Sequence, residues 1–443
     1  MASPVGCLRT GCFLRVGRRA SACRPIGCST AHTRGWTISL LCFGTALVWA
    51  ALPISGQMLL KPASEGERVN PLPSDLAILE SDQARKDLPC MVNSRKPDLG
   101  FDLRFHTGYD VTIPLSELSG EGSLLTVVFR AYPEGAADHA AYFVQKFRVP
   151  AVEEDAKGDA ALSGYLDLGP GKYHFDWLMR DRMERICSSS WSVEAALSPK
   201  DRAMPLFIAP NEIAQSSPEP FVNDGPRPAL GASDGVRVKL LVNFSPQDEQ
   251  SATLQRSDTE ALVSIMKSIE RDPHVNRISL VAFNMGESRI VYRQDSESGI
   301  DFAALGKALD RVKLGTVSVQ QLGDKHGETN FLEHLIETEV ARTDQPDAVI
   351  FAGPKAMLNA DVPQSELRRI GEVECPVFYM NYNLNPQAVP WKDSISHAIK
   401  AFNGTEYTIS RPRDLWTTTS EMLNRIVRSK RQKTASSSLG GSH

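Results

Sequence analysis

The fold of the C-terminal half is decided by residues 236–247, which read Val-Arg-Val-Lys-Leu-Leu-Val-Asn-Phe-Ser-Pro-Gln. The apolar run predicts a strand buried in a sheet. Three polar residues, Asn243, Ser245 and Gln247, follow at its carboxyl end. Ligands of open α/β sheets bind beyond the carboxyl ends of the strands, so a functional site is expected near these residues.

The pattern from 236 to 427 alternates between strands and helices. Further strands are expected at 278–283, 289–292, 348–352, 376–380 and 406–409, and helices at 262–269, 302–312, 331–340, 365–370, 394–402 and 414–427. The first two of these strands flank a short turn and form a hairpin. The alternation predicts a Rossmann-type, mostly parallel sheet with helices on both faces and one antiparallel edge strand.

This order of elements resembles the von Willebrand factor A (VWA) family, and most of all the VWA-related domains of secreted acidobacterial proteins. The resemblance covers nearly all of 236–427. In members that bind metal, an Asp-x-Ser-x-Ser strand end, a Thr in a later loop and an Asp after the fourth strand surround a divalent cation. Here Asn243, Ser245 and Gln247 stand at the first motif, Thr329 matches the loop Thr, and Gly353 lies in the place of the later Asp.

Both carboxylates of that metal site are therefore missing. Mg²⁺ is held by hard oxygens with enough negative charge to offset its dehydration, so the sequence predicts a degenerate site without a metal cofactor. Asn243, Ser245 and Thr329 are the remaining candidates for a divalent cation. The alternative is structural, with Asn243 and Ser245 capping loop amides.

The carboxyl edge remains a candidate rim for a protein or peptide ligand. A merely solvated set of loops is the alternative. The residues expected to gather at this rim are Asn243, Ser245, Gln247, Thr329, Asn330, Gly353 and Asn381.

The region 98–197 has a different, all-β pattern. Short β runs are expected at 101–105, 109–115, 124–132, 142–149, 161–168, 172–179 and 185–193. Seven such strands predict an immunoglobulin- or fibronectin-like sandwich. The sequence before Tyr173 resembles a tyrosine corner, and Trp177 and Trp191 are expected core residues. Cys90 and Cys187 flank this region, where either a disulfide or two free thiols would fit.

The first 35 residues carry six arginines and no acid, and they lead into an uncharged run at 36–52. Residues 1–57 are expected to be a secretory signal peptide, or else an uncleaved membrane anchor. We therefore expect an exported protein in the periplasm, the cell envelope or the medium. Residues 58–97 are interpreted as a spacer, 198–235 as a Pro-rich linker and 428–443 as a disordered tail.

The formal charge of −4 argues against a nucleic-acid partner. Ser394 and His397 lie one turn apart on an expected helix, and the chain has neither a Gly-x-Ser-x-Gly elbow nor a Gly-rich phosphate loop. We expect a non-enzymatic interaction or scaffolding protein. The alternative is a cell-envelope enzyme or accessory subunit that uses the crevice at the carboxyl edge, with or without a divalent metal.

Overall fold

The computed structural model describes residues 58–60, 72–81, 84–216, 219–223, 235–248, 251, 254–310, 326–340, 346–371, 373–385, 387, 390 and 392–440. The expected signal or anchor at 1–57 lies outside these ranges. Within them, no helix has the length and apolar character needed to span a bilayer.

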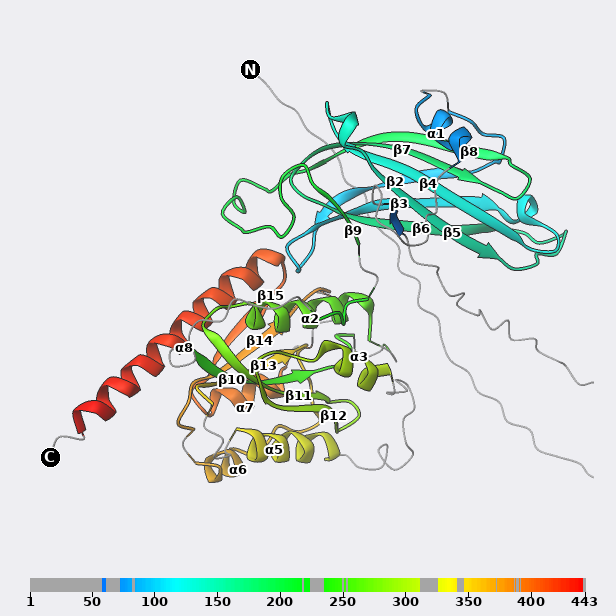
Figure 1. Ribbon diagram of the computed structural model, residues 1–443. Helices are drawn as coiled ribbons and strands as arrows, with labels where there is room; N and C mark the ends of the chain where they lie inside the picture. The colour runs from blue at the N-terminus through cyan, green and yellow to red at the C-terminus, as the bar shows by residue number, and fades with distance from the viewer. Residues whose placement is uncertain are drawn as a thin grey trace, which may run out of the picture. The chain divides into compact units, whose positions relative to one another are not determined.

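The N-terminal part is a sandwich of two antiparallel sheets (Figure 1). One sheet has the order β1 (Met58–Leu60), β5 (Ala141–Val149), β4 (Ser123–Pro133), β7 (Gly171–Arg180) and β8 (Ile186–Ala195). The other has the order β2 (Met91–Leu99), β3 (Phe105–Pro114), β6 (Asp159–Leu168) and β9 (Ile213–Gln215). Short 3-10 turns, η1 (Leu115–Leu118) and η2 (Ala137–His139), follow β3 and β4. The predicted antiparallel sandwich is confirmed.

The core of the sandwich is aromatic and includes the predicted tyrosine corner. The hydroxyl of Tyr173 donates to the carbonyl of Gly169 at 2.8 Å, which ties the start of β7 to the backbone before it. Trp177 is fully buried, and Tyr109 packs edge-on against it with ring centroids 5.3 Å apart. Trp191 is only partly buried and stacks on Phe175.

Three sequence predictions are wrong in this region. The expected spacer at 58–97 contributes β1, most of β2 and helix α1 (Pro73–Leu79) to the sandwich. Helix α1 packs on β4 and β7, and its Leu79 joins an apolar cluster on their outer face. Residues 101–104 form a turn rather than a strand, and the expected linker supplies β9. The short elements β1, α1 and β9 are held by packing on the sandwich. Their own few apolar residues do not predict a strand or a helix.

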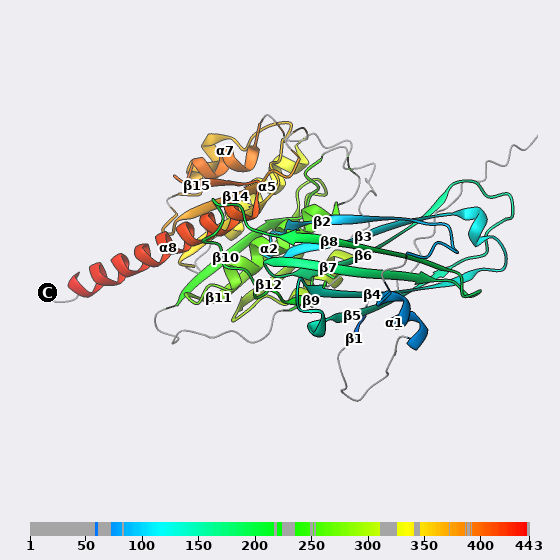
Figure 2. The ribbon, with the colours of Figure 1, turned by 90° about the horizontal axis from the view of Figure 1, so that it is seen from above.

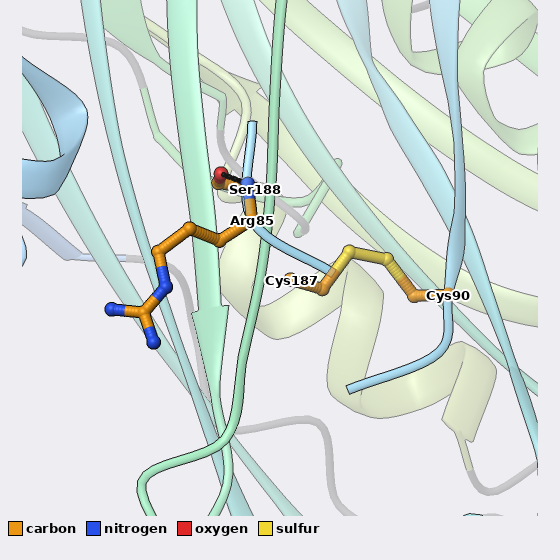
Figure 3. Close-up of a disulfide and its surroundings, with 4 residues drawn as sticks. All are labelled: Arg85, Cys90, Cys187 and Ser188. Atoms are coloured by element: carbon orange, nitrogen blue, oxygen red, sulfur yellow. Dashed lines mark hydrogen bonds between the residues drawn. A yellow bond between two sulfur atoms is a disulfide. The ribbon is translucent and has the colours of Figure 1, made fainter. Parts of the chain in front are cut away.

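A disulfide joins Cys90 to Cys187, with 6.3 Å between their Cα atoms. It fastens the chain before β2 to β8, alongside backbone hydrogen bonds from Leu88 to Ile186 and from Ser188 to Arg85. The amide of Arg85 also donates to the hydroxyl of Ser188 at 2.8 Å (Figure 3). The disulfide thus links elements of the two sheets.

We predict that replacing Cys90 and Cys187 together by Ala lowers the free energy of unfolding of the sandwich by about 2–5 kcal/mol. The physical reason is the long loop, because the two cysteines are 97 residues apart in sequence. Urea unfolding followed by tryptophan fluorescence measures the change, and Cys375→Ala is the matched control because Cys375 is a free thiol. A double variant as stable as the parent would contradict the assignment.

The C-terminal part is an α/β domain with one six-stranded sheet (Figure 1). Its order is β12 (Arg289–Glu297), β11 (Val275–Asn284), β10 (Val236–Asn243), β13 (Ala348–Gly353), β14 (Val377–Tyr382) and β15 (Thr405–Ile409). All neighbours are parallel except β12, which pairs antiparallel with β11 at the edge. The predicted mostly parallel sheet with one antiparallel edge strand is confirmed.

Helices cover both faces of this sheet. One face packs against α2 (Arg256–Glu270), α3 (Phe302–Asp310) and α8 (Pro412–Gly440). The other packs against α5 (Gly327–Glu339), α6 (Gln364–Arg369) and α7 (Ser394–Lys400). Every residue of β13 and β14 is buried, as expected for inner parallel strands.

Helix α8 corrects the predicted disordered tail, because it continues through Gly440 and extends as a single helix past the sheet (Figure 2). Lys430 holds this extension at its base. Its ammonium group donates to the carbonyl of Gly235 at 2.6 Å and pairs with Asp347 at 3.0 Å. Tertiary contacts of the lysine therefore stabilise a segment whose composition alone is typical of a flexible tail.

Lys239, on the central strand β10, is only 4% exposed. Its ammonium group donates to the backbone carbonyl of Glu339 at 3.2 Å and lies 3.4 Å from that residue's carboxylate. The positive charge thus caps the carboxyl end of α5, where the helix dipole is negative. This interaction fixes α5 against the sheet and so fixes the position of Thr329 at its other end.

Candidate functional site

Asn243, Gly353 and Asn381 lie side by side at the carboxyl edge of the α/β sheet. Asn243 and Gly353 end the neighbouring strands β10 and β13, Asn381 is the last residue but one of β14, and Gly353 pairs directly with Asn381. Gly353 must be small, because a Cβ there would come within 2.7 Å of the Cβ of Asn243. Asn243 and Asn381 are 1% and 0% exposed. The structure thus brings these three residues of the expected rim together but places them beneath the surface.

Asn243 and Ser245 hold the turn that connects β11 to β12. The amide of Met285 donates to the side-chain oxygen of Asn243 at 3.1 Å and to the hydroxyl of Ser245 at 2.9 Å. The amide of Gly286 also reaches that hydroxyl, at 3.3 Å. The hydroxyl of Ser245 in turn donates toward Asn243 or Asn284. These contacts are those of the structural alternative, in which the two residues cap loop amides.

Gln247 and Thr329 are likewise buried and engaged with backbone. The side-chain oxygen of Gln247 accepts from the amide of Leu384, and its NH₂ group donates to the carbonyl of Asn385, both at 2.8 Å. The hydroxyl of Thr329 donates to the carbonyl of Ala360 at 2.6 Å. Asn330, by contrast, is exposed on α5. Gln247 therefore joins the segment after β10 to the segment after β14. Thr329 joins the start of α5 to the segment after β13.

These residues do not fit a divalent cation. The oxygens of Asn243, Ser245 and Thr329 take part in internal hydrogen bonds. None of the three supplies a negative charge, which Mg²⁺ needs to offset its dehydration. The geometry of the three side chains is explained by the loops that they hold.

The segment 354–363, which we call the β13–α6 loop, is anchored partly by Tyr379 and Asp393, which sequence analysis did not select. The hydroxyl of Tyr379 donates to the carbonyl of Pro354 at 3.0 Å. Around Ala356, the amide donates to Asp393 at 3.4 Å and the carbonyl accepts from the amide of Ser394 at 2.8 Å. The start of α7 and the strand β14 thus hold the first part of the loop.

The second part of the loop is held by Ser394 and by an ion pair. The hydroxyl of Ser394 accepts from the amide of Leu358 at 3.3 Å and donates to the carboxylate of Asp361 at 2.7 Å. Lys392 pairs with the other oxygen of Asp361 at 2.9 Å. Together with the bond from Thr329 to Ala360, these contacts reach Pro354, Ala356, Leu358, Ala360 and Asp361.

Ser394 and His397 do not form a nucleophile–base pair. Ser394 is 0% exposed and bonds to Asp361, whereas His397 contacts Gln364 at 3.2 Å. A serine that is buried and already donates its proton to a carboxylate is not placed to attack a substrate. The contacts of Ser394 are those of a residue that fixes the loop.

Asp393 caps the N-terminus of α7 and has an unusually high pKa. One oxygen of its carboxylate accepts from the amides of Ile395 at 3.1 Å, Ser396 at 3.3 Å and Ala356 at 3.4 Å. The other oxygen is buried without a hydrogen-bond partner among the described residues. Burial raises the pKa of Asp393 to about 6, against the opposing effect of the amides of Ser396 and Ala356.

We predict that Asp393→Asn is at least as stable as the parent at pH 7.5. The folded pKa of Asp393 lies above its ordinary 3.8, so the folded state binds the proton more tightly, and its stability falls as pH rises from about 4 through 6. The amide keeps an oxygen for the three backbone N–H groups and removes the buried charge. At about 1.4 kcal/mol per pKa unit, the gain at pH 7.5 is at most about 3 kcal/mol, and it vanishes near pH 4.

Urea unfolding at pH 4, 6 and 7.5 measures this difference, and Asp361→Asn is the matched control. Despite the effect of burial, the ion pair with Lys392 and the bond from Ser394 lower the pKa of Asp361, so its neutral variant loses stability most at pH 7.5. An Asp393→Asn variant that is destabilised equally at every pH would contradict the account of the buried charge.

A second polar cluster lies in the sandwich and was also missed. Asp102, His106 and Asp167 are the group of potential metal ligands found within the described ranges. His106 contacts Asp167 at 2.8 Å through one ring nitrogen and Asp102 at 3.0 Å through the other. Burial opposes the charge on His106, but its bonds to the two carboxylates outweigh burial and raise its pKa to about 10.

Arg104 completes this cluster, 3.4 Å from the carboxylate of Asp167 and 3.9 Å from that of Asp102. Two cations thus balance two carboxylates, and the arrangement is complete without a metal. Asp167 faces His106 across neighbouring strands, 61 residues away in sequence. No local spacing could have placed Asp167 in the cluster with Asp102 and His106.

Comparisons with known proteins leave the family open. No family model and no curated protein sequence matches the chain. Among solved structures, the PilB minor pilin from Streptococcus sanguinis matches 70% of this chain over 88% of its own, with 9% identity and a TM-score of 0.27. A mutant of the same pilin matches 78% over 80%, with 7% identity and a TM-score of 0.28.

A β-glucuronidase from Bacteroides uniformis matches 66% of this chain over 33% of its own, with 12% identity and a TM-score of 0.18. At such TM-scores, neither the pilin nor the glucuronidase bears on function. The sandwich and the mostly parallel sheet of the α/β domain rest on the sheet topology described above.

Proposed function

We propose that this chain is an exported, non-enzymatic interaction protein, whose VWA-like domain binds a protein or peptide partner at its carboxyl edge without a metal. The observation that carries the proposal is that the polar side chains at this edge point inward and form hydrogen bonds with loop backbone. Asn243, Ser245, Gln247 and Thr329 fix neighbouring loops. Loops held on a rigid sheet are a common way to present a binding surface.

Export is supported by the cysteines. The bond between Cys90 and Cys187 is typical of proteins that fold in an oxidising compartment. It agrees with the basic and then apolar sequence expected to direct secretion. Cys375, as a free and partly buried thiol, is compatible with the same compartment.

The alternative of an enzyme is less well supported. A cavity of about 200 Å³ lies in the α/β domain, and its walls are mainly apolar, with Phe221, Phe244, Leu254, Val291 and Leu309 beside Thr259, Asn284 and Asp310. It offers a single carboxylate, whereas acid–base chemistry draws on paired groups of different pKa. The buried Ser394 and the half-buried Asp393 hold the β13–α6 loop and the start of α7 instead.

Calorimetric titration of Mg²⁺, Mn²⁺ and Ca²⁺ into the full chain tests the metal-independent part of the proposal. We expect no saturable heat at millimolar ion, because the matched positions lack a carboxylate. Asn243→Ala and Thr329→Val are the companion variants. Saturable binding in the parent that both variants lose would overturn the proposal and establish a cation site built from substitute ligands.

A further inference from the structure

We propose that the β13–α6 loop is the docking element for an extended peptide segment that carries an acidic residue two positions from a large apolar one. This inference rests on the proposed function and names the surface and the partner chemistry. The loop follows β13 at the carboxyl edge and contains neither helix nor strand. Three features carry the proposal: its alternating burial, its anchoring and the chemistry of its exposed side chains.

Burial alternates along the loop from Pro354 to Asn359. Pro354, Ala356 and Leu358 are buried, whereas Met357 is 37% exposed, Asn359 is exposed and Lys355 is partly exposed. Alternation with a period of two is the signature of an extended chain. In such a chain, side chains on one side recur about every 6.5–7 Å. The loop therefore presents Lys355, Met357 and Asn359 in a row.

The anchors of the loop all reach its buried side. Tyr379, Asp393, Ser394 and Thr329 hold the backbone at 354, 356, 358 and 360. None of these bonds uses the side chain of Lys355, Met357 or Asn359. Fixing a binding segment before the partner arrives reduces the entropy lost on association. The anchoring thus leaves a rigid exposed row free to make contacts.

The three outward side chains define what the row can bind. Met357 offers a flexible apolar surface, which suits contact with varied apolar side chains. Lys355 forms no ion pair within the described ranges, and its positive charge lowers the pKa of the nearby Asp393. Asn359 offers both a donor and an acceptor to a peptide backbone. A carboxylate opposite Lys355 and an apolar side chain opposite Met357 would lie two residues apart on an extended partner.

Selection from a phage-displayed library of random 12-residue peptides, on the immobilised full chain in EDTA, tests this inference. We expect enriched peptides with an acidic residue two positions from a large apolar one. Their affinity, measured by fluorescence anisotropy, should fall at least about tenfold in Met357→Ser and in Lys355→Glu. Met183→Ser is the matched control, because Met183 is 78% exposed on the turn between β7 and β8, and it should bind as the parent does.

Each contrary outcome has a distinct meaning. Peptides that bind Met357→Ser and Lys355→Glu as well as the parent would overturn the docking element but leave a metal-independent binding protein in place. Failure to enrich any peptide would also overturn the docking element. In a parallel selection in Mg²⁺, peptides whose binding is abolished by EDTA would overturn the proposed function itself.

Anchor variants separate positioning from contact. Thr329→Val removes the bond to Ala360, 31 residues away, without changing a side chain of the exposed row. It should weaken peptide binding, and Thr329→Ser, which keeps the hydroxyl, should restore it. Equal affinity in the Val and Ser variants would overturn the claim that the loop binds because it is held rigid.

Discussion

Hydrogen bonds between buried polar side chains and loop backbone order the carboxyl edge of the α/β domain, although the side-chain nitrogen of Asn243 and the side-chain oxygen of Asn381 have no hydrogen-bond partner among the described residues. An unpaired polar atom in a protein interior costs about 1–3 kcal/mol. Asn243, Gln247 and Thr329 are all at most 5% exposed, and each finds its main partner in the backbone of a connecting loop. These side chains therefore determine the conformation of the loops at the carboxyl edge.

These hydrogen bonds explain how the chain's own residues order the carboxyl edge. An Asn at 243 can accept from the turn amide of Met285 without the charge that a buried Asp would bring. Gly353 leaves room for the Asn243 side chain beside it. A cation would have to displace hydrogen bonds that fix the loops, and it would gain only neutral ligands in return.

The sequence predicted the arrangement of strands well because apolar runs such as 236–242 and 348–352 are long and bounded by turns. Strand order then places Asn243, Gly353 and Asn381 together at one edge. The inward direction of the polar side chains at this edge could not be predicted, because their partners are remote in sequence. Asn243 accepts from an amide 42 positions away, Gln247 bonds to a residue 138 positions away, and Ser394 bonds to Asp361 across 33 positions. The helical tail and α1 were missed for the same reason, since tertiary contacts of Lys430 and Leu79 hold them.

Hydrogen exchange of the amides of Ala356 and Leu358 in the full chain, compared with a free peptide of residues 354–363, tests the central claim most directly. The account predicts exchange at least about tenfold slower in the protein, because a buried hydrogen bond protects an amide until the structure opens. It also predicts that Ser394→Ala removes the protection of Leu358 while the amide of Met285 keeps its own. Exchange of both loop amides at the rate of the free peptide would contradict the claim that buried side chains hold the loop rigid.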